Sequence, residues 1–135
     1  TEYYRGYAGE TLSGVAFKAV TYQGYSGEIE LMLGVDETGK VSGVRILKHA
    51  ETPGLGAKYA DPEVLDAFYA NRGLADTDWR VGKDGGDLDA VTGATVTGRA
   101  IGEAIDEGLE RFAADRAAID AAERAPETPV QEATP

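Results

Sequence analysis

Hydrophobic and polar residues alternate along the first third of the chain, as is typical of β-strands with one buried face. Four segments show this alternation or are rich in aromatic and β-branched residues: 3–7, 15–22, 28–35 and 41–47. In the third of them, Ile29, Leu31 and Leu33 fall on one face, and Glu28 and Glu30 fall on the other. We therefore predict a β-strand at each of the four segments.

Turn-forming residues separate the predicted strands. Residues 9–14 and 25–27 contain glycine and polar residues, and the third and fourth strands are joined by a hairpin loop that ends at Gly39, which is suited to a positive φ. The fourth strand alternates less strictly than the third, because Val41 and Leu47 break its pattern. Short connections join neighbouring antiparallel strands, so the sequence predicts an antiparallel meander.

Two helices are predicted after the strands. Asp61 is a favourable N-cap and Pro62 a favourable first helical residue, so a short helix is expected over residues 63–69. A long amphipathic helix is expected from about Thr97 onward, because apolar positions recur there with the period of an α-helix. These positions are Val96, Ala100, Ala104, Gly108 and Phe112, flanked by Ile101, Ile105 and Leu109.

The order of strands, short helix, loops and long helix predicts the α+β class, with an antiparallel sheet packed against a long C-terminal helix and a shorter helix. Residues 51–56 and 76–89 are loops by composition. The chain has 135 residues, which suits one domain, and we expect that domain to span residues 1–124. The proline-rich segment 125–135 is expected to be a disordered C-terminal tail.

The net charge and the cysteine count exclude several classes of function. The chain carries 24 acidic and 13 basic residues, a net charge of -11, and it has no cluster of Lys or Arg, so no nucleic-acid partner is expected. It has no cysteine, which excludes disulfides, thiolate catalysis and iron–sulfur ligation. His49 is its one histidine, which excludes a multi-histidine metal site. Redox chemistry would therefore require an organic cofactor.

The sequence also bears on the membrane. No segment approaches the roughly 20 consecutive apolar residues of a membrane-spanning helix. The sequence begins at Thr1, without an initiator methionine. We therefore expect the chain to be a soluble fragment of a longer protein.

Residues 89–98 join an extended stretch to the beginning of the long helix and are mostly small. The unpaired N–H groups and the positive end of a helix favour a bound anion, above all a phosphate. Thr92, Thr95 and Thr97 place three hydroxyl groups within six residues. From the residues alone, two interpretations stay open: a phosphate site, or ordinary N-capping of the helix by Thr95 or Thr97.

The same segment resembles the flavinylation motif of FMN-binding domains in the RnfG/NqrC family. Residues 92–97 read Thr-Gly-Ala-Thr-Val-Thr and follow Asp89, and the family motif runs Asp-x-x-[Ser/Thr]-Gly-Ala-Thr-x-[Ser/Thr]. Two further stretches are similar to RnfG in particular. One is Gly-Tyr-Ser-Gly at 24–27, which leads to Glu-Thr-Pro-Gly-Leu-Gly at 51–56, and the other is residues 79–87, which include Lys-Asp-Gly-Gly-Asp at 83–87. Their order and approximate spacing agree over about residues 22–109, so the chain is identified as a member of this family.

The resemblance implies that FMN is the cofactor and that its phosphate is joined by a phosphoester to the hydroxyl of Thr97, the last threonine of the motif. In such proteins a separate flavin transferase of the ApbE type makes the bond, with FAD as donor and Mg²⁺. An outside enzyme makes chemical sense, because a threonine hydroxyl is a weak nucleophile without an adjacent base, and no histidine lies beside Thr97 in the sequence. The other predicted cofactor-binding residues are Thr92, Gly93, Ala94, Thr95, Glu51, Thr52, Gly54, Leu55, Gly56, Trp79 and Lys83.

Several of these predicted contacts have a structural alternative. Glu51 either contacts the flavin ring or a partner, or is a solvated loop carboxylate. Trp79 is either a neighbour of the ring or a core aromatic residue, and Lys83 either meets the phosphate or a flavin carbonyl, or is simply exposed. Asp89 either ends a strand or is recognised by the transferase, and the resemblance favours recognition. His49 is expected to be a surface residue at the end of a strand.

The family resemblance further implies an electron-transfer subunit of a membrane-bound, ion-translocating oxidoreductase complex of the Rnf type. Its expected partners are the other subunits of the complex and the flavin transferase, and no substrate turnover is expected from this domain alone. The resemblance places it on the periplasmic side of the bacterial inner membrane, anchored by an N-terminal helix that is absent from this chain. The alternatives are an NqrC-like subunit of a sodium-pumping quinone reductase, a stand-alone flavinylated carrier or reductase domain, and an anion- or peptide-binding module without flavin.

Overall fold

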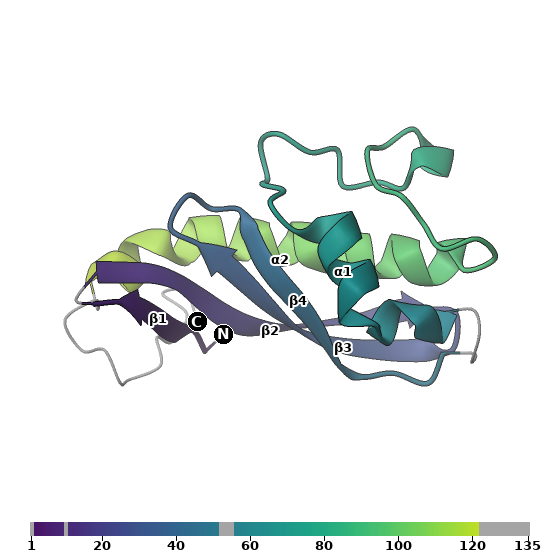
Figure 1. Cartoon of the computed structure of the whole chain (residues 1–135), viewed down its shortest axis with the longest axis horizontal. Helices are drawn as coiled ribbons and strands as arrows, with labels where there is room; N and C mark the ends of the chain where they lie inside the picture. The colour runs from purple at the N-terminus through teal and green to yellow at the C-terminus, as the bar shows by residue number, and fades with distance from the viewer. Residues whose placement is uncertain (1, 10, 52–55, 122–135) are drawn as a thin grey trace.

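A four-stranded antiparallel sheet forms the centre of the protein (Figure 1). The computed structural model describes residues 2–9, 11–51 and 56–121. The strands follow one another in the sheet as they do in the chain: β1 (Tyr4–Ala8), β2 (Thr11–Gly24), β3 (Gly27–Asp36) and β4 (Val41–Lys48). Each neighbouring pair is antiparallel, which confirms the predicted meander.

The pairing of β2 with β3 carries the centre of the hydrophobic core. Phe17 pairs with Leu33 and Ala19 pairs with Leu31, and all four side chains are buried. The predicted alternation of β3 is confirmed, because every second residue of the strand is buried. β2 begins at Thr11, earlier than predicted, because its first residues pair with β1 through backbone hydrogen bonds that a hydrophobic pattern does not reveal.

A β-bulge explains the irregular pattern of β4. The register between β3 and β4 shifts between Gly34 and Val35, so that Val41 pairs with Val35 and Val44 pairs with Leu33. The extra residue in β4 returns Val41 to the core side of the sheet, and both Val41 and Val44 are buried. The break that Val41 makes in the alternation therefore marks a bulge within a continuous strand.

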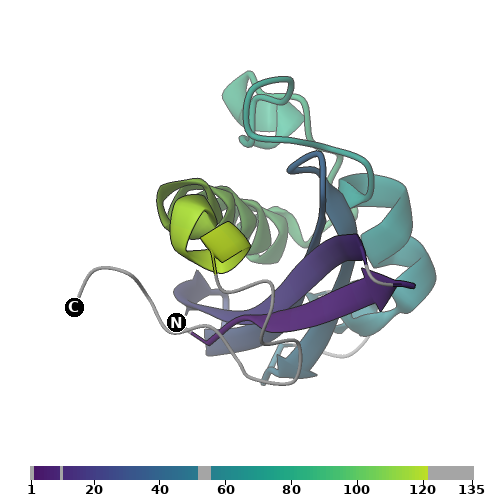
Figure 2. The same ribbon diagram turned by 90° about the vertical axis from the view of Figure 1, so that its left-hand side faces the viewer.

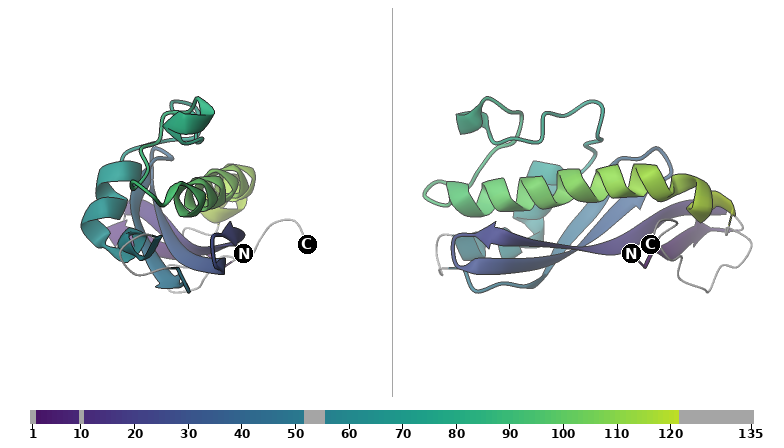
Figure 3. Two further views of the ribbon diagram at one scale, coloured as in Figure 1. Left: turned by 90° about the vertical axis from the view of Figure 1, so that its right-hand side faces the viewer. Right: turned by 180° about the vertical axis from the view of Figure 1, so that it is seen from behind.

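The long helix α2 (Thr95–Ala121) lies lengthwise across one face of the sheet, mainly along β2 and also against β3 (Figures 2 and 3). Its buried apolar side chains include those of Ala100, Ile101, Ala104, Ile105, Leu109 and Phe112, as predicted. Gly108 allows the helix to approach the sheet closely, because a Cβ at this position would lie 3.0 Å from Cδ2 of Leu33. Val96 was predicted to share the buried stripe but is 40% exposed, since the first turn of α2 borders a cavity.

The short helix α1 (Pro62–Tyr69) packs against β4 and follows the 3₁₀ helix η1 (Gly56–Ala60). Its start is the predicted one: Asp61 is the N-cap, and its side chain accepts a hydrogen bond of 2.9 Å from the N–H of Glu63. η1 was not predicted, because a single short turn contains too few positions to display a period.

The segment between α1 and α2 is mostly irregular, as its composition predicted, and contains the 3₁₀ helix η2 (Gly82–Asp84). Arg99 of α2 holds this segment, because its guanidinium donates to the carboxylate of Asp84 at 2.7 and 3.0 Å. The α+β class, with a long and a short helix on an antiparallel sheet, is confirmed. No helix within the described ranges is long and apolar enough to cross a membrane.

A buried hydrogen bond ties the beginning of the chain to α2. The hydroxyl of Tyr3 donates to Oδ2 of Asp115 at 2.6 Å, and the two residues are 0% and 4% exposed. We expect Tyr3→Phe to lower the free energy of unfolding by about 1–3 kcal/mol, because it removes a donor from a buried carboxylate. Urea denaturation followed by circular dichroism measures this change.

Tyr4→Phe is the matched control. It removes a hydrogen bond of 2.8 Å between the Tyr4 hydroxyl and Glu2, but at an exposed position. Its effect on the free energy of unfolding should stay within about 0.5 kcal/mol. Equal losses in the two variants would contradict the structural role of the buried Tyr3 contact.

Candidate functional site

A hydrogen bond between Glu51 and Thr97 lies at the centre of the candidate site. Glu51 follows β4, and Thr97 lies in the first turn of α2. The Thr97 hydroxyl donates to Oε1 of Glu51 at 2.6 Å. Both side chains are buried, with exposed fractions of 1% for Thr97 and 5% for Glu51. A carboxylate therefore lies directly against the hydroxyl that the sequence motif singles out.

The Glu51 carboxylate also holds the turn between β2 and β3. The backbone N–H groups of Tyr25 and Ser26 donate to its Oε1 and Oε2 at 2.9 and 2.7 Å. The backbone N–H of Glu51 itself donates to Nδ1 of His49 at 3.1 Å. The β2–β3 turn, the residues after β4 and the start of α2 therefore meet at one side chain.

These hydrogen bonds keep Glu51 ionised. Burial by itself raises the pKa of the carboxyl group, but the hydrogen bonds from the Thr97 hydroxyl and from the backbone of Ser26 and Tyr25 stabilise the charged form. Together these hydrogen bonds outweigh burial and hold the pKa below its ordinary value of 4.5. At neutral pH the side chain is a carboxylate and acts as an acceptor of hydrogen bonds.

The backbone turns into α2 through Gly93 and Ala94. Gly93 has a φ of 80°, in the left-handed region that favours glycine. The carbonyl of Ala94 accepts a bond of 3.1 Å from the N–H of Gly98, so Ala94 occupies the N-cap position. Thr95 and Thr97 lie inside the first turn, and the Thr97 hydroxyl is bonded to a carboxylate. The interpretation that one of these threonines caps the helix is therefore wrong.

This helix start offers donors for an anion. The N–H of Ala94 is used, because it donates to the carbonyl of Val91 at 2.9 Å. The N–H groups of Thr95, Val96 and Thr97 have no partner within the helix, since they lie in its first turn. They lie at the N-terminus of the helix, which is the positive end of its dipole and favours a negatively charged group.

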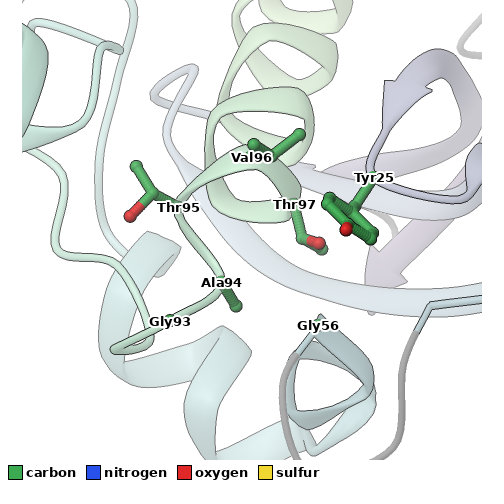
Figure 4. Close-up of a pocket in the computed structure, with 7 residues that line it drawn as sticks. All are labelled: Tyr25, Gly56, Gly93, Ala94, Thr95, Val96 and Thr97. Carbon is green, nitrogen blue, oxygen red and sulfur yellow. The ribbon is translucent and has the colours of Figure 1, made fainter.

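A cavity of about 490 Å³ opens beside this first turn (Figure 4). It is lined by Tyr25, Gly56, Gly93, Ala94, Thr95, Val96 and Thr97. Its volume lies within the range of roughly 300–1,000 Å³ that is typical of small-molecule sites. A cavity bounded by a helix N-terminus suits a small molecule that carries a phosphate.

Two glycines let neighbouring segments pack closely against the start of α2. A Cβ at Gly56 would lie 2.6 Å from Oγ1 of Thr97 and 2.9 Å from Cβ of Glu51. A Cβ at Gly98 would collide with the hydroxyl of Tyr59, which accepts a hydrogen bond from the segment before α2. The close packing around the Thr97 hydroxyl therefore depends on the absence of a side chain at Gly56, and the packing of Tyr59 against α2 depends on its absence at Gly98.

Six of the predicted cofactor-binding residues lie together at this site: Glu51, Gly56, Gly93, Ala94, Thr95 and Thr97. In Figure 4 the side chain of Thr97 points toward Tyr25, whereas that of Thr95 points away from both. Thr92 is exposed and does not line the cavity. The predicted contacts of Thr52, Gly54 and Leu55 lie outside the described residues.

Trp79 and Lys83 do not line the cavity. Trp79 is 5% exposed, and its Nε1 donates to a backbone carbonyl at 3.1 Å, which supports the alternative of a core residue. Lys83 is exposed on η2, and its neighbour Asp84 binds Arg99 of α2. Because Arg99 lies two positions after Thr97, it projects from a different side of the helix.

Two features of the site were not predicted from the sequence. Tyr25 was assigned only to a turn, yet it lines the cavity and is 74% exposed. The contact of Glu51 with Thr97 joins residues 46 positions apart, and no periodicity reaches over that distance. The one available signal was that the Gly-Tyr-Ser-Gly and Glu-Thr-Pro-Gly-Leu-Gly stretches both resembled the same family.

Comparison with protein families identifies the same region. The family model described as "FMN-binding domain" matches residues 24–110 of the chain. This match covers more than half of the chain and includes Tyr25, Glu51 and Thr97. It leaves out β1, most of β2 and the part of α2 that follows Glu110.

Relatives of known family are similar over much of the chain. The chain is 46% identical over 102 residues to RnfG, a component of the ion-translocating oxidoreductase complex, from Aliivibrio fischeri (strain MJ11). This match covers 72% of this chain and 48% of the relative. The chain is 43% identical over 101 residues to the protein of the same name from Vibrio cholerae serotype O1 (strain M66-2), covering 71% and 48%. The chain therefore spans about half the length of the curated relatives it matches.

A solved structure is similar in fold. The crystal structure of Shewanella oneidensis NqrC superposes with a TM-score of 0.63 and 25% sequence identity. The superposition covers 81% of this chain and 56% of that chain.

The hydroxyl of Thr97 helps to lower the pKa of Glu51, so Thr97→Val should raise that pKa. NMR titration of the side-chain carboxyl carbons measures it. Thr38→Val is the matched control, because the Thr38 hydroxyl donates to Asp36 at 2.6 Å in an exposed turn. It should raise the pKa of Asp36 and leave that of Glu51 unchanged. An unchanged Glu51 pKa in Thr97→Val would contradict the buried contact.

A lowered pKa also makes stability depend on pH. Ionised Glu51 contributes stability above its ordinary pKa of 4.5, and the contribution is lost as the pH falls through the lower pKa of the folded state. Glu51→Gln should therefore lower the free energy of unfolding by about 1–3 kcal/mol at neutral pH, and by less below the folded-state pKa. Urea denaturation at neutral pH, and again at a pH below the folded-state pKa of Glu51, measures the two losses.

The control is Glu107→Gln, which removes a carboxylate from the exposed side of α2. This variant should change the free energy of unfolding by less than about 0.5 kcal/mol at either pH. A loss in Glu51→Gln that is the same at neutral and acid pH would show that the charge of Glu51 does not supply the stability.

Proposed function

This chain belongs to the family of FMN-binding domains, and on that premise we propose that it is the flavin-carrying domain of an electron-transfer subunit in an ion-translocating oxidoreductase complex. We propose that its FMN is covalent, joined by a phosphoester between the FMN phosphate and the hydroxyl of Thr97. The observation that carries this proposal is the position of that hydroxyl. It lies at the wall of a cavity of about 490 Å³ and in the first turn of a long helix.

The residues at the cavity fit a linked flavin phosphate. A phosphodiester keeps one negative charge, which a helix N-terminus stabilises by about 0.3–1 kcal/mol. The N–H groups of Thr95 and Val96 supply donors beside the attachment point, and Gly93 leaves room for close approach of the backbone. Tyr25 and Gly56 line the cavity from elements other than α2 and are the residues that would border the ring.

Flavin attachment is proposed to need a separate transferase of the ApbE type, with FAD as donor and Mg²⁺. FMN supplies one- and two-electron redox chemistry when bound, and the protein holds it and sets its surroundings. A covalent bond keeps the carrier loaded where free FMN cannot be replaced, which suits the periplasmic side of a bacterial inner membrane. Asp89, which precedes the motif and is exposed, is proposed as a point that the transferase recognises.

The names of the relatives support the proposal of a complex. Two of them are RnfG components of an ion-translocating oxidoreductase complex, and the identity to them is 43–46%, against 25% to NqrC. We therefore propose the Rnf type of complex rather than the sodium-pumping quinone reductase. The partners would be the other subunits, and anchoring would come from an N-terminal membrane helix of the longer protein.

The cavity supports an electron carrier rather than a reductase of a small acceptor. None of the cavity-lining residues in the described part of the chain is His, Lys, Arg, Asp or Glu, so among the usual acid–base side chains only Tyr25 borders the cavity there, and its phenol is a weak acid. The folded unit is proposed to span residues 1–124, because Tyr3 is bonded to Asp115 and α2 extends to Ala121.

Attachment of the flavin is tested by producing the chain together with the transferase and measuring its intact mass. We expect one adduct with the mass of FMN less water, and we expect Thr97→Ala to abolish it. Thr38→Ala, in the β3–β4 hairpin, is the matched control and should carry the adduct fully. An adduct that survives Thr97→Ala, or no adduct on the unaltered chain, would contradict the covalent site.

A further inference from the structure

We propose that Glu51 accepts the hydroxyl proton of Thr97 when the flavin is attached, and that this contact selects Thr97 as the nucleophile among the threonines of the motif. This role rests on the covalent attachment proposed above. In this proposal the chain that receives the flavin supplies one catalytic group for its own flavinylation. Without this group the chemistry of attachment would depend on the transferase alone.

The selection follows from the geometry of the three motif threonines. The Thr97 hydroxyl already donates to Oε1 of Glu51, and the oxygen–oxygen distance of 2.6 Å lies within the reach expected between a hydroxyl and the base that takes its proton. Among the described residues, neither Thr92 nor Thr95 donates to a carboxylate, and the Thr95 side chain points away from Thr97 (Figure 4). A weakly nucleophilic hydroxyl is therefore paired with a base at one position of the motif.

The carboxylate is held in place before any reaction. Oε2 accepts the N–H of Ser26 at 2.7 Å, and Oε1 accepts the N–H of Tyr25 at 2.9 Å in addition to the Thr97 hydroxyl. Gly56 packs against the pair, since a Cβ there would reach within 2.6 Å of Oγ1 of Thr97. Because both oxygens are bonded, the group cannot turn away from the hydroxyl without losing a backbone donor. Such preorganisation is the usual means by which a protein lowers the barrier of a polar reaction.

The transfer balances with FAD as the co-reactant. Oγ1 of Thr97 forms a bond to the phosphorus on the flavin side of the pyrophosphate, and the bond from that phosphorus to the AMP oxygen breaks. AMP leaves with the electron pair, the hydroxyl proton passes to Oε1 of Glu51 and then to solvent, and nothing is oxidised or reduced. Protein kinases use a carboxylate in the same way to accept the proton of a substrate hydroxyl. A histidine beside Thr97 is therefore not required.

The test uses the purified chain without flavin, mixed with transferase, FAD and Mg²⁺, and follows the adduct by intact mass. Initial rates over a range of chain concentrations give kcat and KM separately. We expect Glu51→Gln to lower kcat by about 100-fold or more, as for the loss of a general base. KM should stay within roughly threefold, because the surface that the transferase meets is unchanged.

Two further variants distinguish the role of Glu51 as a proton acceptor from a general effect of removing a negative charge or of disturbing the fold. Glu28→Gln removes a carboxylate that pairs with Lys48 at 3.0 Å at the start of β3, and it should leave kcat unchanged. Gly56→Ala keeps both reacting groups but forces them apart, and it should lower kcat as well. If Glu51→Gln proves unfolded by circular dichroism, a normal kcat in folded Gly56→Ala overturns the role of Glu51.

The outcomes distinguish this role from the proposed function. If the unaltered chain gains FMN on Thr97 and Glu51→Gln gains it with a similar kcat, or with a change in KM alone, Glu51 is not the proton acceptor and the covalent site stands. If the unaltered chain gains no FMN, the covalent site and the role of Glu51 are both overturned. A loss of kcat in Glu51→Gln and Gly56→Ala, with normal rates in Glu28→Gln, supports the role.

Discussion

The buried carboxylate of Glu51 is the group on which the geometry of the site depends. A charged side chain is costly to bury unless donors surround it, and here the donors come from the β2–β3 turn and from Thr97 of α2. The need to satisfy one charge therefore draws together segments that are distant in the chain. The same bonds keep the group ionised, so it can organise the structure and act as an acceptor at the motif threonine.

Two parts of the long helix α2 have different surroundings: most of its length packs against the sheet, and its first turn borders the cavity. From Ala100 to Phe112 its apolar side fills the core over β2 and β3, and Gly108 brings it close to the sheet. The first turn extends beyond this packing, so Val96 is exposed and the N–H groups of the helix start border the cavity. The sheet thus determines where the positive end of the helix dipole lies.

Particular elements show how far local patterns carry a prediction. The alternation of β3, the N-cap at Asp61 and the helical period after Thr97 were read correctly, because each signal lies within a few positions of the residues it describes. The bulge in β4 was seen only as a broken pattern at Val41, since two valines three positions apart share a face only when the strand has an extra residue between them. η1 had too few residues to produce a pattern.

The sequence by itself determined the fold class and the threonine motif at the start of the long helix, because periodicity and short motifs act between near neighbours in the chain. Only the tertiary structure decided that Glu51 lies against Thr97, that Tyr25 borders the cavity, and that Trp79 belongs to the core. These facts depend on how strands and helices pack over separations of tens of residues. At such distances hydrophobic burial and the pairing of buried charge with donors select the neighbours. The hydrophobic pattern shows which face of an element is buried, but not which distant segment covers it.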